Sequence, residues 1–557
     1  MTETTETSSA SGRAPQEDPS IFGLLNTVDH RRIGRMFMVS AVAMLAASVV
    51  LTALVGLDLT DADGFVVFDS HSWAQAFALS RDSFVFLAAL PFFVGMAMFI
   101  VPAQIGAGRL IYPRAALASF WAWKISALIL VGAYLANGGP YGGSRGDSEA
   151  VDLHLIALGM TIASLLLGVV VVVTTILSMR APGLHIDQAP PFTWATLVTG
   201  IGLLLTLPVL VATLSFLYID HRYSTRFDVD FLGGNVGVWS HIEWVYRAPT
   251  LFLLLVPVLG VIGEVLPVAA RRRIIMPAIG TAAVGAVAMF GLGGWTQLAG
   301  VEGATISDGW QGAVYVAMFA GAKLAVVVVV GLHLLTLAEG RAIPKLSAPF
   351  LAGAAAAAMT TLAVVLGTVG AGLDWLESVN AFTIDPELPL RLTTWSDAQF
   401  YLVAGAVALG ISAAMGWWAP LAYGRHLNPA LARLTALLLF VGSFVGALGS
   451  ALTGFVTGQP SDPALNARYD FLADPSTALN TLGAVGLLIF GAGAVLLLLD
   501  VAISLLAGKG AEADDNPWGA FTPEWDTPAD PAESARLPAL TSGTPLLESH
   551  DAEEVSV

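Results

Sequence analysis

Long apolar runs, separated by short polar connections, fill most of this chain. Each run reaches the roughly 20 residues that a helix needs to cross a bilayer. Lipid cannot satisfy an open backbone, so each run is predicted to be a helix. The runs predict about twelve membrane spans, placed at Met36–Leu57, Ser83–Ile105, Ala115–Ala136, Leu155–Met179, Thr193–Ile219, Ile242–Ala269, Ile275–Ala299, Gln311–Leu337, Ala348–Gly370, Gln399–Leu421, Leu431–Val456 and Leu479–Leu506.

The two ends of the chain are polar. Residues 1–30 are rich in Thr, Glu and Ser and contain no apolar stretch of the kind found in a signal peptide. Residues 508–557 are acidic and Pro-rich, which is typical of a segment without its own core. We therefore expect an all-α polytopic membrane protein with a disordered cytoplasmic tail at 1–30, a twelve-helix transmembrane domain at 31–507 and a second cytoplasmic tail at 508–557.

Basic residues predict the topology. Cytoplasmic loops of membrane proteins carry an excess of Lys and Arg. The alternate loops are acidic instead. We therefore expect a multi-pass protein of the cell membrane with both termini in the cytoplasm. The basic residues that lie before the first span or after an even-numbered span are Arg31, Arg32, Arg35, Arg109, Arg114, Arg180, Arg271, Arg272, Arg273, Arg341, Lys345 and Arg425.

Composition narrows the chemistry. Of the 557 residues, 56% are apolar and 12% are charged, and the absence of cysteine excludes disulfides, thiolate metal sites and cysteine nucleophiles. A formal net charge of −17 argues against nucleic acid as a partner. Membrane lipid is the one partner that composition implies.

Two polar motifs near the ends carry a family resemblance. Asn516–Pro528 reads Asn-Pro-Trp-Gly-Ala-Phe-Thr-Pro-Glu-Trp-Asp-Thr-Pro, and Asn26–Gly34 reads Asn-Thr-Val-Asp-His-Arg-Arg-Ile-Gly. Both resemble the terminal signatures of cytochrome c oxidase subunit I, in the haem–copper oxidase family. Shorter matches follow in the family's order between them, at Ile105–Ala107, Tyr112–Arg114, Ser119–Trp121, Asp152–Leu155, Thr174–Met179, Leu205–Leu210 and His241–Trp244.

The resemblance implies a twelve-helix bundle that holds two haems and one copper ion through six histidines. It places one haem ligand on the second helix and two on the tenth. It places one copper ligand on the sixth helix and two on the seventh. Neutral imidazole suits both metals.

The nine histidines of this chain avoid those helices. They are His30, His71, His154, His185, His221, His241, His333, His426 and His550. None falls in the body of the second, sixth, seventh or tenth predicted span. We therefore expect neither haem nor copper, although both are the family's cofactors.

The family's ligand positions hold other residues here. The positions for the haem ligands fall at Asp82, within one residue, and at Ala404 and Ala406. Those for copper fall at Ala248, Gln297 and Leu298. With all six ligands replaced, the family's oxygen reduction and proton pumping are not expected.

Four polar residues remain as possible relics of the family's sites. Lys323 matches a lysine of a proton channel and is interpreted either as a relic of that path or as a neutral or paired lysine, which we favour. Arg247 supplies positive charge near the former copper position, or it forms an interfacial pair with Glu243 at i−4, which we favour. Asp397 keeps half of a His-Asp pair near the family's magnesium site.

The residues favour a catalytically inactive homologue of subunit I. We expect it to act as a structural or accessory subunit, with subunits II and III or a respiratory complex as its partners. The alternatives are a redox-active protein that uses other ligands, and a path for protons or solutes.

Overall fold

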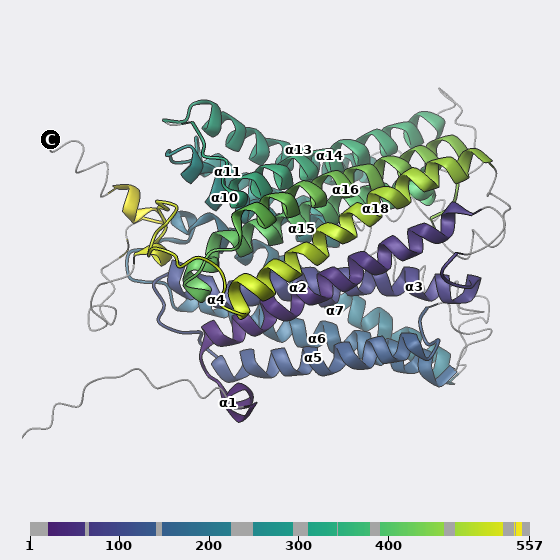
Figure 1. Cartoon of the computed structure of the whole chain (residues 1–557), viewed down its shortest axis with the longest axis horizontal. Coiled ribbons are helices and arrows are strands. Elements are labelled where there is room, and N and C mark those ends of the chain that lie inside the picture. The colour runs from purple at the N-terminus through teal and green to yellow at the C-terminus, as the bar shows by residue number, and fades with distance from the viewer. Residues whose placement is uncertain are drawn as a thin grey trace, which may run out of the picture.

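The computed structural model describes residues 21–61, 66–140, 148–223, 249–292, 310–341, 343–378, 390–461, 474–526, 540 and 542–548. Within these residues the regular structure is helical, and two isolated bridges, Thr393 to Pro460 and Arg425 to Glu512, are the β contacts. The predicted all-α fold is confirmed. Most of the helices run side by side along the long axis of the molecule (Figure 1).

All twelve predicted spans correspond to described helices. Eleven helices are long and apolar enough to cross a membrane, and α11 is a shorter apolar helix. The predicted spans near residues 242–269 and 275–299 extend beyond the described parts of α10 and α11. The helices are α2 (His30–Leu57), α3 (Ser70–Asp82) continued by η2 (Ser83–Ala89) and α4 (Leu90–Gln104), α5 (Pro113–Leu135), α6 (Ser148–Ser178), α7 (Pro191–Tyr223), α10 (Pro249–Ala269), α11 (Pro277–Leu292), α13 (Trp310–Ala338), α14 (Ala348–Ser378), α15 (Thr394–Tyr423), α16 (Pro429–Thr457), and α18 (Asp474–Asp500) continued by η5 (Val501–Leu506).

Two of these elements are the most completely buried of the bundle. The stretch from α3 to α4 and the helix α15 are buried throughout their most apolar segments. A helix that is apolar on all sides has no face for water, and here the surrounding helices take the place of lipid. The family's haem-ligand positions lie on these two interior elements.

Helices α16 and α18 approach each other closely. A Cβ atom at Gly449 would meet the backbone nitrogen of Gly483, and one at Gly486 would meet the backbone nitrogen of Gly446. Small residues allow such close backbone contact between membrane helices. The glycine content of these two helices therefore has a packing reason.

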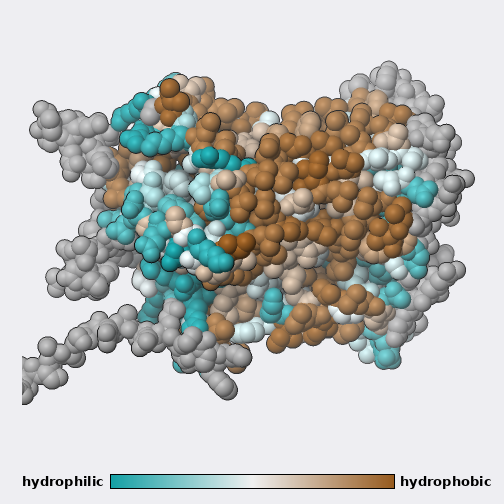
Figure 2. Space-filling view, in the orientation of Figure 1, coloured by the Kyte–Doolittle hydropathy of each residue, from teal (hydrophilic) through white to brown (hydrophobic). Residues whose placement is uncertain are grey.

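Both described ends of the chain lie at one end of the bundle, which we call the terminal face (Figure 1). Ile21–Asn26 form the short helix α1 within the stretch predicted as a polar tail. Residues 507–526, which we call the C-terminal segment, pack against the bundle there and bury Trp525. A broad hydrophobic band covers the middle of the molecule, and hydrophilic surface gathers at the terminal face (Figure 2). The cytoplasmic orientation of this face stays a prediction.

Candidate functional site

Asp82 lies at a break in the helix. It ends α3, and the π-helical turn η2 follows it. Its side chain is buried, and the hydroxyl of Tyr134 in α5 donates a hydrogen bond to Oδ2 at 2.5 Å. The Nε2 atom of His154 in α6 lies 3.5 Å from the same oxygen, and the Tyr134 and His154 rings pack 4.9 Å apart. The position predicted for a haem ligand thus belongs to a buried polar cluster of three helices.

Arg81, one residue earlier, joins the two interior elements. Its Nη2 atom lies 2.5 Å from Oδ1 of Asp397 near the start of α15. The hydroxyl of Ser461 donates a second hydrogen bond to that carboxylate at 2.9 Å. The guanidinium also covers the ring of Phe400 at 4.0 Å, a cation–π contact. Asp397 is therefore the partner of an arginine in this protein.

The residues at the former haem-ligand positions do not fit a haem bound in the family's manner. Ala404 and Ala406 are buried in α15 and carry no atom that can bind iron. Asp82 already accepts a hydrogen bond from Tyr134. One turn before Ala404, the rings of Phe400 and Phe84 pack 5.6 Å apart between the facing helices. Ala404 and Ala406 therefore cannot ligate a haem iron, and Asp82 offers a hydrogen-bonded carboxylate where the family's manner of binding needs an imidazole.

The residues at the positions predicted for copper are not among those that the structure describes. Ala248, Gln297, Leu298, Arg247 and Glu243 lie outside the described residues. Within the described part of the chain, no group of three or more His, Cys, Asp or Glu side chains could hold a metal ion.

Lys323 lies within α13, and its side chain is buried. A charge inside a membrane helix is costly, so such residues are rare and usually face the protein interior. The structure agrees with the interior placement. Whether the residue belongs to a proton path or is merely paired stays a prediction.

A second buried cluster lies at the terminal face and was not predicted from the sequence. Glu264 in α10 and Glu524 in the C-terminal segment are 3% and 6% exposed. The side-chain nitrogen of Gln104, at the end of α4, donates to Oε1 of both carboxylates at 3.0 Å each. The backbone N–H of Phe192 donates to Glu264 at 3.0 Å, and the indole of Trp418 donates to Glu524 at 3.2 Å. We call these two acids the carboxyl pair.

The two acids of the carboxyl pair are close enough to repel each other strongly. Both Oε1 atoms lie 3.0 Å from one nitrogen, so they are at most about 6 Å apart. Two negative charges at that distance repel by about 3 kcal/mol at an effective dielectric constant of about 20. Among the described residues, no Lys or Arg forms an ion pair with either acid. Burial raises the pKa of Glu524, whereas the hydrogen bonds from Gln104 and Trp418 act in the opposite direction.

A cavity of about 130 Å³ reaches from the surface to Glu264. The exposed part of its lining includes Asp187 and Arg273, and the buried part includes His333 of α13. The Nδ1 atom of His333 lies 2.7 Å from the carbonyl of Val329. Because a carbonyl only accepts, Nδ1 carries the hydrogen and Nε2 presents a lone pair.

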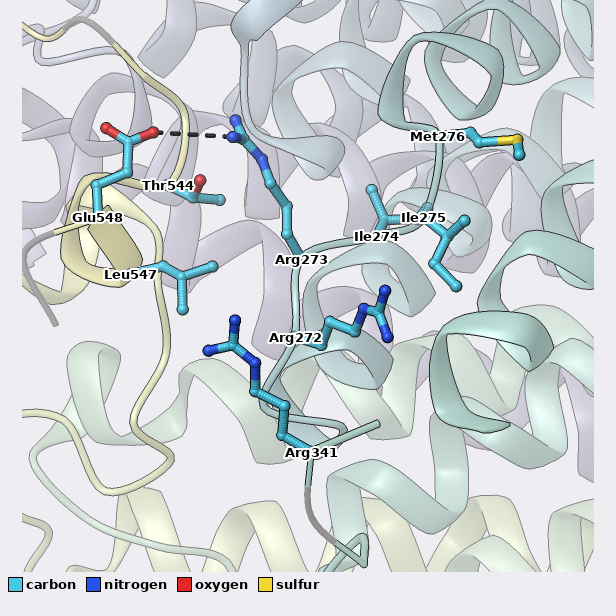
Figure 3. Close-up of a pocket in the computed structure, with 9 residues that line it drawn as sticks. All are labelled: Arg272, Arg273, Ile274, Ile275, Met276, Arg341, Thr544, Leu547 and Glu548. Atoms are coloured by element: carbon cyan, nitrogen blue, oxygen red, sulfur yellow. Dashed lines mark ion pairs between the residues drawn. The ribbon is translucent and has the colours of Figure 1, made fainter. Parts of the chain in front are cut away.

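A basic pocket of about 360 Å³ opens nearby, between the α10–α11 loop and residues 544–548 (Figure 3). Arg273 points toward Glu548, with 3.8 Å between their charged atoms. Arg272 points away from the C-terminal residues and lies 3.1 Å from a carboxylate oxygen of Glu339. Arg341 and Leu547 both line this pocket (Figure 3). In this pocket, arginines that the sequence places in the cytoplasm lie close to residues 544–548.

A bundle of apolar helices, with a hydrophobic band and charged ends, defines a multi-pass helical membrane protein. The chain matches the model of the cytochrome c and quinol oxidase polypeptide I family over residues 32–492. It belongs to that family.

Relatives of this chain match along most of its length. A probable cytochrome c oxidase subunit 1-alpha of Streptomyces coelicolor is 28% identical, with 97% of this chain and 92% of the relative covered. Cytochrome c oxidase subunit 1 of Bacillus subtilis is 25% identical, over 94% and 83% of the two chains. A haem–copper oxidase subunit I+III of Aeropyrum pernix is 28% identical, over 92% of this chain and 61% of the relative.

The fold also matches a solved structure. A chain of a haem–copper terminal oxidase dimer superposes with a TM-score of 0.66 at 13% sequence identity, covering 90% of this chain and 88% of that one. This likeness confirms the predicted architecture. The proposed loss of the redox centre depends on this chain's own residues.

Asp82 and Asp397 were predicted from the sequence, but their partners Tyr134 and Arg81 were not. Gln104 and Glu264, which belong to the carboxyl pair, were not predicted either. The sequence does contain a feature that points to these residues, namely charged side chains in or beside an apolar run. Arg81 and Asp82 stand next to a predicted span, and Glu264 lies within one. Such charges call for a partner, but the sequence does not show which one.

Proposed function

We propose that this protein is a subunit I homologue that binds neither haem nor copper and acts as a structural or accessory subunit of a membrane complex. The observation that carries the proposal is the chemistry at the haem positions. Two are alanines, and the third is an aspartate in a hydrogen bond with Tyr134. A family member without iron ligands keeps its helical bundle but has no site for electron transfer.

The names of the relatives support assembly into a multi-subunit complex. They are called subunits, and one combines subunits I and III in a single chain. We propose that this chain likewise assembles with oxidase-type subunits II and III or with a respiratory complex. It would lie in the cell membrane with the terminal face in the cytoplasm.

Purification from native membranes tests the accessory role. A tag on this chain is expected to recover other respiratory subunits at a constant ratio. The chain separated from those subunits is expected to hold far less than one copper ion. The Bacillus subtilis relative, purified in the same way, is the control. Recovery of the chain alone, or of one copper ion per separated chain, would contradict the proposal.

A second candidate function is conduction of protons or solutes, favoured by buried Lys323 and by the carboxyl pair. Reconstitution into liposomes tests it. Proton flux that is lost in Lys323→Met would support conduction, whereas flux equal to that of empty liposomes would exclude it.

A further inference from the structure

The carboxyl pair is held only by hydrogen-bond donors. The hydroxyl of Thr193 donates to Oε1 of Gln104 at 2.7 Å, which turns the amide nitrogen toward both acids. Gln104 Nε2, Phe192 N and Trp418 Nε1 supply the hydrogen bonds to the acids. The buried hydroxyl of Thr522 also faces both acids. These neutral donors lessen the negative charge at each acid but do not cancel it. The arrangement therefore favours one net negative charge over two.

One oxygen of the carboxyl pair is a candidate position for an additional proton. Oε2 of Glu524 is buried and has no hydrogen-bond partner among the described residues. A carboxylate oxygen without a donor is costly when buried. A proton at the pair removes one of the two charges, and an oxygen that carries the proton donates a hydrogen bond instead of needing a donor.

A cavity leads to the pair from the terminal face. The cavity that reaches Glu264 also contains the buried imidazole of His333, whose Nε2 atom has no hydrogen-bond partner in the described structure. A lone pair at the edge of a cavity can accept a proton and pass it on. The neutral partners of the carboxyl pair come from α4, α7 and α15. The titratable or charged groups that face the pair or its cavity are Glu264 from α10, His333 from α13, Asp187 before α7 and Arg273 after α10.

We propose that Glu264 and Glu524 form a proton-binding site that holds one shared proton, reached from the terminal face past His333, and that this proton keeps the C-terminal segment docked on the bundle. Glu524 belongs to that segment, whereas Glu264 belongs to a membrane helix. Loss of the proton leaves one negative charge on the C-terminal segment and another on α10, and the two charges repel each other across the contact between them. The inference is independent of whether the protein binds haem.

The expected pH dependence follows from the buried state of Glu524. Its pKa is raised by burial above the ordinary value of 4.5. Docking is therefore most stable below that ordinary pKa, and it weakens as the pH rises through the higher value of the docked state.

Hydrogen exchange of residues 516–526 in the full-length protein in nanodiscs tests the proposal. Between about pH 5 and about pH 9, the wild-type protection factor, corrected for intrinsic exchange, is expected to fall by about tenfold or more. Glu264→Gln and Glu524→Gln, which mimic the protonated acid, are expected to abolish this dependence. Glu512→Gln, at an exposed position of the same segment, is expected to retain it.

Infrared spectroscopy provides a readout that does not depend on docking. The wild-type protein at neutral pH is expected to show the carbonyl stretch of a buried protonated carboxyl group, and Glu264→Gln is expected to reduce or shift this band. A wild-type protection factor that is constant across the pH range would overturn the proposal, and this measurement needs no variant to fold. A pH dependence that survives in both Gln variants, or a carbonyl band that neither variant changes, would also overturn it.

Discussion

Arg81 and Asp82 stand at the position predicted for one of the family's haem ligands, and each side chain has a partner on another helix. Arg81 pairs with Asp397, and Asp82 accepts a hydrogen bond from Tyr134. A buried ion pair adds little net stability, because removing two charges from solvent is costly. Breaking the pair is far more costly, since one charge then stays buried alone. These residues should therefore tolerate joint replacement better than single replacement.

Arg81→Met is expected to lower the free energy of unfolding by about 3–5 kcal/mol, because it leaves Asp397 buried without its cation. The double variant Arg81→Met, Asp397→Leu is expected to recover most of this loss. Unfolding by SDS titration of the purified protein measures both. A double variant that is no more stable than Arg81→Met would show that the ion pair does not explain the effect.

For individual residues, the sequence predicts which side chains stand at the family's ligand positions but not which side chains they contact. The ligand positions could be read one at a time, so Asp82, Ala404 and Ala406 were identified. The contacts of Asp82 and Asp397 were not predictable, because Arg81 and Asp397 are separated by 316 residues. The carboxyl pair was missed for the same reason, as it forms only when α4, α10 and the C-terminal segment come together.

Among the helices, α16 and α18 show how small residues determine packing. Their glycines face one another, so their backbones lie in contact and a methyl group has no room at several positions. Other glycines of the bundle face open space, among them Gly159 in α6. Replacing glycine with alanine should therefore lower stability where two helices touch and should not lower it where the glycine faces open space.

Gly449→Ala is expected to destabilise the protein by about 1–3 kcal/mol, because the added methyl group meets the backbone of Gly483. Gly159→Ala is the matched control. There the gain in helix propensity, up to about 1 kcal/mol, should leave stability unchanged or raise it. Thermal unfolding of the two variants, side by side, gives the comparison. Equal effects at both positions would contradict the packing proposed for α16 and α18.

The helices themselves were predictable because lipid restricts the possible structures so strongly. An apolar run such as Leu431–Val456 can only be a helix in a bilayer, and it matches α16 closely. What was not predictable is which helices lie inside the bundle. The run at Gln399–Leu421 resembles the others in the sequence, yet α15 is buried throughout its most apolar segment.

In the whole molecule, the C-terminal segment is a structural part of the bundle. Trp518 stacks on Trp417 of α15 with ring centroids 5.6 Å apart, and its indole donates to the Trp417 carbonyl at 2.9 Å. Trp525 is buried, and Glu524 reaches the carboxyl pair. The acidic composition of this region indicated a segment without its own core. The core that it uses belongs to the bundle.

Trp518→Ala is expected to weaken docking of the segment by roughly 1.5–3 kcal/mol, because it removes a large apolar contact. Trp518→Phe keeps an aromatic ring and loses only the N–H donor, so its effect should be smaller. Hydrogen exchange of residues 516–526 reports both. If the Ala variant exchanges as slowly as the wild type, Trp518 does not anchor the segment.

We propose above all that this subunit I bundle has lost its redox centre. The most direct measurement is the haem content per polypeptide of the protein purified from a host with ample haem, together with its absorption spectrum. We predict far less than one haem per chain and no Soret band above background. One or more haems per chain, with a Soret band that shifts on reduction, would contradict the claim.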